Sequence, residues 1–335
     1  MMRRAMVVIL SALVLTSVSP IAPAADNKVR IGFQPGTSPR FFVARDHGMF
    51  KKVGLTAEYV QFIAGPPMLS ALETGTIDMA FMTTAPAIFG LAQGIDYRVF
   101  FVEADASQSV ALVSTKRAGI KTLAEQRGKR IGVQFGTSAH YALLRSLEAA
   151  KLKETDLKIL DMQASVIVPA FLKGNIDGGW AWDPWVARMQ AEGGSMVWAL
   201  SDQRLPMPLV WVVRTAWLNS NRDTVQLFIK AMELSHAYLM ENPKEGIASL
   251  GQVFGVNEEL AKQIYNRIEV PSIKEQVTGY VGALGTSSTK ATSGMATHMS
   301  DLASFFFALK RIPVKPDVIR AIDPGPLEAY TAKKR

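Results

Sequence analysis

The sequence predicts an α/β fold of two similar units, each a mainly parallel sheet flanked by helices. Short apolar strands alternate with helical stretches through most of the chain, and a second set of these elements begins near residue 110. From residue 221 onward the pattern is mostly helical. A strand–helix–strand order favours parallel strands with helices covering both faces. The alternation of strands and helices, and its repetition from residue 110, therefore predict the fold class.

The first unit begins with residues 28–33, where polar and apolar residues alternate as they do in a strand. Gly and Pro residues then end the strand in the turn 34–37. The following elements are a helix over 39–50, an extended stretch over 56–62, a helix around 68–74 and a strand over 77–81.

The second unit repeats this order and ends in one more strong strand. We expect strands over 110–113, 130–133, 158–160 and 178–182, and helical segments over 123–126, 138–150 and 166–172. The apolar run 209–213 predicts the last strand. Strands 110–113 and 209–213 are expected to pass between the two units and to act as a hinge.

The N-terminus has the layout of an export signal. Arg3 and Arg4 precede an apolar run over 5–18, and the small residues Ala22 and Ala24 mark a cleavage site before Ala25. A retained anchor is the alternative, but the apolar run is shorter than the roughly 18 residues that a membrane helix needs. We therefore predict a periplasmic protein that loses residues 1–24.

Composition excludes several classes of site. The 335 residues include no Cys, so neither a disulfide nor a thiolate metal site can form. Loss of Arg3 and Arg4 lowers the net charge from +8 to +6, which favours anionic small molecules. The charges are spread along the chain. The basic stripe interleaved with aromatics that is typical of nucleic-acid binding does not occur, so we predict no nucleic-acid partner. No cofactor or metal site is predicted.

The proposed ligand site lies where strands of both units end, because open α/β sheets bind ligands outside the carboxyl ends of their strands. Gly136, Thr137 and Ser138 open a helix whose first N–H groups have no partner within the helix, a suitable place for an oxyanion. The alternative is an ordinary helix cap, for which Thr and Ser are preferred in any helix.

Other polar residues follow the same strand ends. Thr83 and Thr84 can face the anion from the opposite unit, or form a plain strand-to-helix turn. Gln34 can donate its side-chain amide. His140 and Tyr141, in the first turn of the proposed anion-binding helix, can either face the ligand or pack against a neighbouring strand.

A carboxylate between two aromatic residues stands at the end of strand 178–182. Trp182 and Trp185 flank Asp183, and aromatic faces with a carboxylate attract an ammonium group. In the alternative interpretation Asp183 caps the next helix while the tryptophans pack in the core. One residue can do both.

Several blocks resemble, in the same order, the binding proteins of taurine and aliphatic-sulfonate ABC importers, part of the nitrate/sulfonate/thiamine-precursor binding family. The blocks are residues 128–133, 137–144, 174–178 and 209–214. The resemblance implies a monomeric, two-lobe periplasmic binding protein of type II, with residues 25–108 and 214–335 in one lobe and 109–213 in the other. The lobes close over a solute and dock on a membrane permease.

One position departs from the taurine-binding pattern, which has an Asp where this chain has Leu209. Either Asp183 pairs with the ammonium, or the ligand is an alkanesulfonate without one. A carboxylate or betaine ligand and a chemoreceptor partner remain alternatives. An exported enzyme is a further alternative, although neither a Ser-centred elbow nor a Gly-rich phosphate fingerprint occurs.

Overall fold

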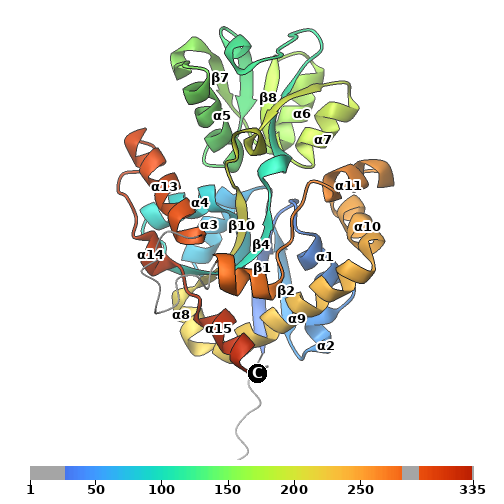
Figure 1. Cartoon of the computed structure of the whole chain (residues 1–335), viewed down its shortest axis with the longest axis vertical. Helices are drawn as coiled ribbons and strands as arrows, with labels where there is room; N and C mark the ends of the chain where they lie inside the picture. Colours follow the sequence, from blue (N-terminus) through green and yellow to red (C-terminus); the bar gives the residue numbers. More distant parts are fainter. Residues whose placement is uncertain (1–26, 281–293, 334–335) are drawn as a thin grey trace, which may run out of the picture.

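The chain forms two α/β lobes, one above the other in Figure 1. The computed structural model describes residues 27–280 and 294–333. The N-terminal strands and the orange and red C-terminal helices build the lower lobe, and the green middle of the chain builds the upper one (Figure 1). The predicted export signal and the cleavage before Ala25 lie outside the described residues. In the described part of the chain, no helix has both the length and the apolarity that a membrane crossing requires.

The first lobe contains a five-stranded sheet in the order β2-β1-β3-β10-β4. Strand β1 runs parallel to β2 and β3, whereas β10 is antiparallel to β3 and β4. The strands are β1 (Lys28–Phe33), β2 (Thr56–Gln61), β3 (Met79–Thr83), β4 (Tyr97–Asp105) and β10 (Pro208–Arg214).

The second lobe repeats the arrangement in the order β7-β6-β8-β5-β9. Strand β6 is parallel to β7 and β8, and β5 is antiparallel to β8 and β9. The strands are β5 (Val110–Ser114), β6 (Arg130–Val133), β7 (Lys158–Asp161), β8 (Gly178–Trp182) and β9 (Ser195–Ala199). Two mainly parallel sheets with covering helices confirm the predicted fold class.

Helices surround both sheets (Figure 1). Those of the second lobe are α5 (Ser138–Ala149), α6 (Ala164–Leu172) and α7 (Trp185–Ala191). Those of the first lobe are α1 (Pro39–Asp46), α2 (Met49–Lys52), α3 (Gly65–Glu73), α4 (Thr84–Ala92), α8 (Thr215–Ser220), α9 (Arg222–Glu241), α10 (Pro243–Phe254), α11 (Glu258–Tyr265), α12 (Ile273–Glu275), α13 (Met295–Ala308), α14 (Val318–Ala321) and α15 (Gly325–Ala332).

The chain passes between the sheets twice. It leaves β4 through a 3₁₀ turn at Ser107–Ser109 and enters β5, and it returns from β9 through a second 3₁₀ turn at Leu200–Gln203. The predicted strands 110–113 and 209–213 do not themselves span the lobes, because β5 is bonded only into the second sheet and β10 into the first. By sheet membership the second lobe ends before Pro208 rather than at Val213.

Local sequence explains where several elements differ from the prediction. The predicted helix 39–50 divides into α1 and α2 at Gly48, whose φ of 64° is left-handed. The predicted helix around 68–74 begins earlier, as α3 at Gly65, because Pro is favoured in a first helical turn, where its missing N–H has no helical acceptor. Strands β4 and β9 carry no clear alternation, and the sequence analysis missed both.

Each lobe contains an equivalent, partly exposed arginine–aspartate pair between neighbouring strands. Arg30 binds the Asp78 carboxylate through its backbone N–H (2.9 Å) and its guanidinium Nε (3.0 Å). Arg130 binds Asp177 in the same way, at 2.9 and 3.1 Å. In the first lobe the pair connects β1 to the residue just before β3, and in the second lobe it connects β6 to the residue just before β8. The two lobes therefore share this local geometry.

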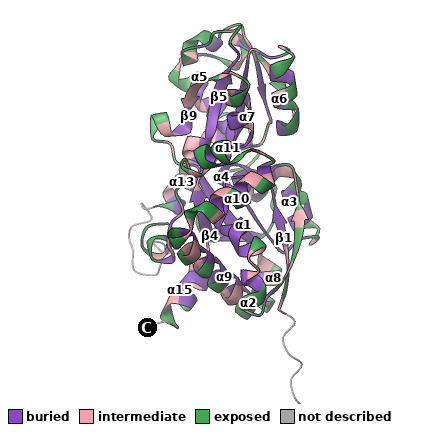
Figure 2. Ribbon diagram, turned by 90° about the vertical axis from the view of Figure 1, so that its right-hand side faces the viewer, coloured by how far each residue is buried: buried purple, intermediate pink, exposed green. Residues whose placement is uncertain are grey.

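Buried residues, purple in Figure 2, concentrate in the strands and at the junction of the lobes. One continuous apolar cluster includes Trp211 of the first sheet and Trp180 of the second. Tyr141 of α5 also packs edge-on against Phe305 and Phe306 of α13, with ring centroids 5.4 and 5.8 Å apart. The lobes are therefore held in contact by apolar packing beside the crossing segments.

Candidate functional site

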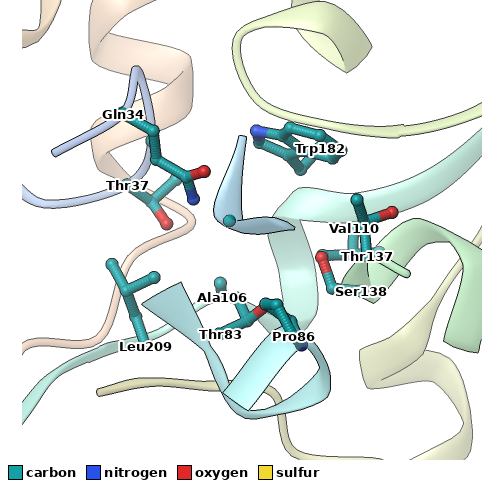
Figure 3. A pocket seen from close by; sticks show the side chains of 12 residues that line it. Gln34, Thr37, Thr83, Pro86, Ala106, Val110, Thr137, Ser138, Trp182 and Leu209 are labelled. Atoms are coloured by element: carbon teal, nitrogen blue, oxygen red, sulfur yellow. The ribbon is translucent and has the colours of Figure 1, made fainter. Parts of the chain in front are cut away.

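A small cavity, partly open to solvent, lies between the lobes (Figure 3). Its wall combines loops at the ends of strands from both sheets with residues beside the two crossings. The lining residues are Gln34, Gly36, Thr37, Gly65, Thr83 and Pro86 from the first lobe, Thr137, Ser138 and Trp182 from the second, and Ala106, Val110 and Leu209 beside the crossings. The stretch around residue 137 thus faces an interlobe cavity, as the sequence analysis requires.

The start of α5 forms one wall of this cavity. Thr137 is the N-cap, and its Oγ1 accepts from the N–H of His140 at 3.4 Å. Gly136 has a φ of 74°, a conformation that favours glycine, although it does not itself line the cavity. The N–H groups of Ser138 and Ala139 have no acceptor in a preceding helical turn, and the described residues supply none. Two donors and the positive end of the helix dipole therefore remain available.

Two side chains bring further unpaired polar atoms to the cavity. Trp182, at the end of β8, is 7 % exposed, and its indole Nε1 finds no hydrogen-bond partner among the described residues. Gln34, at the end of β1, is 6 % exposed, and its Oε1 likewise lacks a partner there. In Figure 3 the indole nitrogen of Trp182 points toward the side of the cavity that carries Gln34. In the cavity wall, the indole N–H of Trp182 is free to donate to a ligand and the amide oxygen of Gln34 is free to accept from one.

No ionisable side chain appears among the described residues that line the cavity. Leu209, which stands where the taurine-binding pattern has an Asp, lies in the wall and is 2 % exposed. The wall therefore offers N–H and O–H groups and the amide oxygen of Gln34, together with apolar surface. Such a wall suits a small anion with an apolar substituent and gives an ammonium group no countercharge.

Thr83 and Thr84 point to different surroundings. Thr83 ends β3 and lines the cavity. Thr84 is fully buried beside it, and its Oγ1 lies 2.7 Å from Nε2 of His298 in α13. A contact of Thr83 with the ligand stays a prediction, whereas Thr84 bonds within the first lobe and is absent from the cavity wall.

His140 and Tyr141 follow the cavity wall but do not form it. The His140 ring stacks on Phe135 at 4.3 Å, and its Nδ1 accepts weakly from the N–H of Gly136 at 3.4 Å. Burial lowers the pKa of His140 to about 4, and the charge of Arg311 acts in the same direction, so the ring is neutral at pH 7. Tyr141 points to α13. Neither residue lines the cavity, and their ring contacts are to a loop residue and to α13 instead of the neighbouring strand that the alternative interpretation named.

Asp183 is fully buried and is held by partners outside the cavity wall. Its Oδ1 accepts from the N–H of Ala187 in α7 at 3.1 Å, and Oδ2 lies 3.2 Å from Nη1 of Arg267. Burial raises the pKa of Asp183 to about 6, although the Arg267 charge opposes the shift. The helix-capping contact is thus present, and Asp183 is absent from the cavity wall. Trp185 also lies outside the wall and packs under Arg188, whose guanidinium carbon is 5.2 Å from its ring.

The two lobes carry related turns that were not predicted. Gln34-Pro35-Gly36-Thr37-Ser38 precedes α1, and Gln134-Phe135-Gly136-Thr137-Ser138 opens α5 at positions 100 higher. Gly36 and Thr37 line the cavity and were not among the predicted site residues. The recurrence of Gln-x-Gly-Thr-Ser after a matching strand is the signal that would have found them.

The family is decided by a comparison of the sequence with family models. The model of the NMT1-like family matches residues 22–250. The chain belongs to the NMT1-like family. The match covers both sheets and the cavity wall described above.

Individual relatives of this NMT1-like chain have a similar length. The "Putative aliphatic sulfonates-binding protein" of Escherichia coli (strain K12) is 27% identical over 313 residues, which cover 92% of this chain and 93% of the relative. The taurine-binding periplasmic protein of the same organism is 27% identical over 239 residues, covering 69% and 74%. Both names agree with the resemblance that the sequence blocks indicated.

Solved structures share the fold. The alkanesulfonate-binding protein SsuA from Xanthomonas axonopodis pv. citri bound to MOPS aligns with a TM-score of 0.75 and 22% identity over 88% of this chain and 97% of that one. The desulfurization enzyme DSZB aligns with a TM-score of 0.68 and 14% identity over 92% and 99%. At these identities the likeness concerns the fold alone.

Proposed function

We propose that this protein is the periplasmic solute-binding component of an ABC importer, and that it captures a small alkanesulfonate between its lobes. The relatives named for aliphatic sulfonates and taurine support the solute class and the compartment. A membrane permease is the partner that such a role requires. The lobes close around the solute, so that the closed form is the one the ligand binds best.

The observation that carries the proposal is the open start of α5 at the cavity wall. A sulfonate oxygen placed there accepts from the N–H groups of Ser138 and Ala139 and gains from the helix dipole. The indole N–H of Trp182 supplies another donor from the same lobe. Across the cavity, the amide of Gln34 and the hydroxyl of Thr83 supply donors from the other lobe, so closure adds bonds to the same anion.

An alkanesulfonate without an amino group fits this wall better than taurine. Leu209 is apolar where taurine binders place a carboxylate, and Asp183 already has Arg267 as its partner. An ammonium group enclosed here would lose water without gaining a counterion, which is costly in a buried site. Selection against taurine is therefore part of the proposal.

A calorimetric panel tests the ligand class. We expect ethanesulfonate and butanesulfonate to bind more tightly than taurine, with acetate and betaine weaker still. Binding of taurine equal to ethanesulfonate would remove the argument from Leu209. No binding of any sulfonate, together with tight binding of a carboxylate or a betaine, would replace the proposed ligand class.

Recovery of the ligand separates binding from catalysis. We propose that the protein has no enzymatic activity, and we expect bound alkanesulfonate to be recovered unchanged by mass spectrometry after prolonged incubation. The shared fold of DSZB makes the measurement necessary. Conversion of the sulfonate with repeated turnover would assign the cavity to an enzyme instead.

A further inference from the structure

Arg267 connects the two lobes beside the cavity. It follows α11 in the first lobe, and its segment is held to the first sheet because the N–H of Asp105 in β4 donates to the carbonyl of Glu269 at 2.9 Å. From there the Arg267 side chain reaches the second lobe. In Figure 1, α11 lies at the top of the lower lobe, and it contacts α7 of the upper lobe.

The guanidinium of Arg267 binds two side chains of the second lobe. Nη1 lies 3.2 and 3.4 Å from the two carboxylate oxygens of Asp183, and Nη2 donates to Oε1 of Gln190 in α7 at 2.9 Å. Asp183 has no exposed surface, whereas the Arg267 side chain is 19 % exposed. A buried carboxylate depends strongly on its counterion, so separation of the lobes here would require Asp183 to regain water.

The same carboxylate is next to the ligand wall. Trp182, which carries the unpaired indole N–H, directly precedes Asp183, and the backbone N–H of Asp183 donates to the carbonyl of Ser109 in the first crossing at 3.1 Å. Arg267 therefore acts on a residue that is fixed both to the hinge and to the cavity. A shift of Asp183 must move the end of β8 and with it Trp182.

A second interlobe ion pair lies elsewhere and is less buried. Arg311, which follows α13, pairs with Glu154 of the second lobe, and their side chains are 29 % and 38 % exposed. Exposed pairs contribute little because water and salt screen them. The two pairs thus allow a direct comparison between a buried and an exposed connection across the same junction.

We propose that Arg267 is a positioning residue that holds the lobes closed through Asp183 and Gln190 and thereby keeps Trp182 against the ligand. The inference rests on the proposed function, since it assumes that the closed form binds the solute. Arg267 does not line the cavity, so it acts on affinity through the fraction of molecules that are closed. Its loss should weaken every ligand by the same factor.

Calorimetry with ethanesulfonate and butanesulfonate gives the first test. Arg267→Gln should raise both dissociation constants by about 10- to 100-fold, the usual range of coupling between a conformational equilibrium and a binding site. Arg267→Lys should recover part of the affinity, because it keeps the charge near Asp183. Arg311→Gln, the matched control, should change the constants less than about threefold. Equal effects of Arg267→Gln and Arg311→Gln would overturn the proposal.

A ligand-free distance measurement keeps the test independent of the solute. The chain has no Cys, so the exposed Lys51 and Lys173 can be replaced by Cys and spin-labelled, one in each lobe. Arg267→Gln should shift the distance distribution toward the open form without ligand, whereas Arg311→Gln should not. An unchanged distribution would overturn the role of Arg267. Absence of sulfonate binding by the wild type would instead contradict the proposed function.

The double variant Asp183→Asn with Arg267→Gln guards against misfolding, since it leaves no unpaired buried charge. If Arg267→Gln alone does not fold, this variant is measured in its place. It should show the same shift to the open form and weakened binding of both sulfonates. Wild-type distances and affinities in the double variant would overturn the proposal.

Discussion

The helix starts that follow the two related turns have different surroundings. In the first lobe the N–H of Phe41, in the first turn of α1, donates to Oε1 of Glu103 at 3.2 Å. In the second lobe the described residues offer no carboxylate to the N–H groups of Ser138 and Ala139, although the N–H of Phe135 in the preceding turn donates to Oδ1 of Asp161 at 3.0 Å. One helix start thus carries an internal anion, and the other is open to a solute. Similar local sequence does not give a similar role; the neighbouring strand decides it.

The residues two positions after the turns, Arg40 and His140, also differ in charge. Arg40 and Glu103 are both fully buried, with Nε of Arg40 3.5 Å from Oε2 of Glu103 and the guanidinium carbon 4.5 Å from the centre of the Phe101 ring. Trp211 also donates its indole N–H to Oε2 of Glu103 at 2.8 Å. The second lobe has the neutral His140 at the position equivalent to Arg40. The start of α1 is therefore fixed by internal contacts, although Gln34, Gly36 and Thr37 of its turn line the cavity, whereas the start of α5 is suited to binding.

The largest effect is expected from removing the internal anion. Glu103→Gln should lower the free energy of unfolding by about 3 kcal/mol, because Arg40 then stays buried without its counterion. Urea denaturation measures the change. Glu58→Gln, on the exposed strand β2, is the control and should change stability by less than about 0.5 kcal/mol. A loss below about 1 kcal/mol for Glu103→Gln would show that the first turn does not need its anion.

The converse change fills the open turn. Ser138→Asp places a carboxylate at the start of α5, where it should lower the affinity for ethanesulfonate by at least about 100-fold through like-charge repulsion. Stability should rise by about 0.5 kcal/mol, because a negative charge is favourable at a helix N-terminus. Ser138→Asn has nearly the same size without the charge, and calorimetry should give it a much smaller loss. Equal affinities of the two variants would place the anion elsewhere.

A smaller loss of affinity is expected when one hydrogen-bond donor is removed from the cavity wall. Trp182→Phe keeps most of the apolar wall and removes the indole N–H, so ethanesulfonate binding should weaken by about 10-fold, the worth of one hydrogen bond to a charged group. Trp185→Phe is the matched control. Its indole Nε1 also has no partner among the described residues, but it lies outside the cavity wall, and calorimetry should show little change. Equal losses would remove Trp182 from the ligand shell.

The smallest effect on stability is expected at the Arg130–Asp177 pair, the counterpart of the Arg30–Asp78 pair in the first lobe. The hydrogen bond from Arg130 holds the pKa of Asp177 at about 2, below its ordinary value of 3.8. A lowered carboxylate pKa gives stability that is present above pH 4 and is lost as the pH falls through about 2. Asp177→Asn should therefore lower the melting temperature slightly at pH 7, and the difference from the wild type should vanish near pH 2. A difference that persists at pH 2 would point to packing instead of charge.

Much of the framework was predictable because it depends on local patterns. Strands β6 and β8 match the predicted ranges 130–133 and 178–182, since each is a short apolar run bounded by turn residues. The placement of Thr137 as the cap of α5 follows from the preference of Thr for that position. The residues of the cavity wall were harder to predict, because local patterns do not show which neighbouring side chain faces the cavity. Asp183 and Trp182 are adjacent, yet only Trp182 lines the cavity.

The amino-acid sequence by itself determined the two-unit α/β design, the strand ends that approach each other and the helix start suited to an anion. These features depend on periodicity, turn residues and capping preferences within a few neighbouring positions. Only the tertiary structure decided that Glu103 occupies the start of α1, that Arg267 meets Asp183 across the lobes, and that Leu209 lies in the wall. Each of these contacts joins residues far apart in the chain, and their distances depend on how both sheets pack.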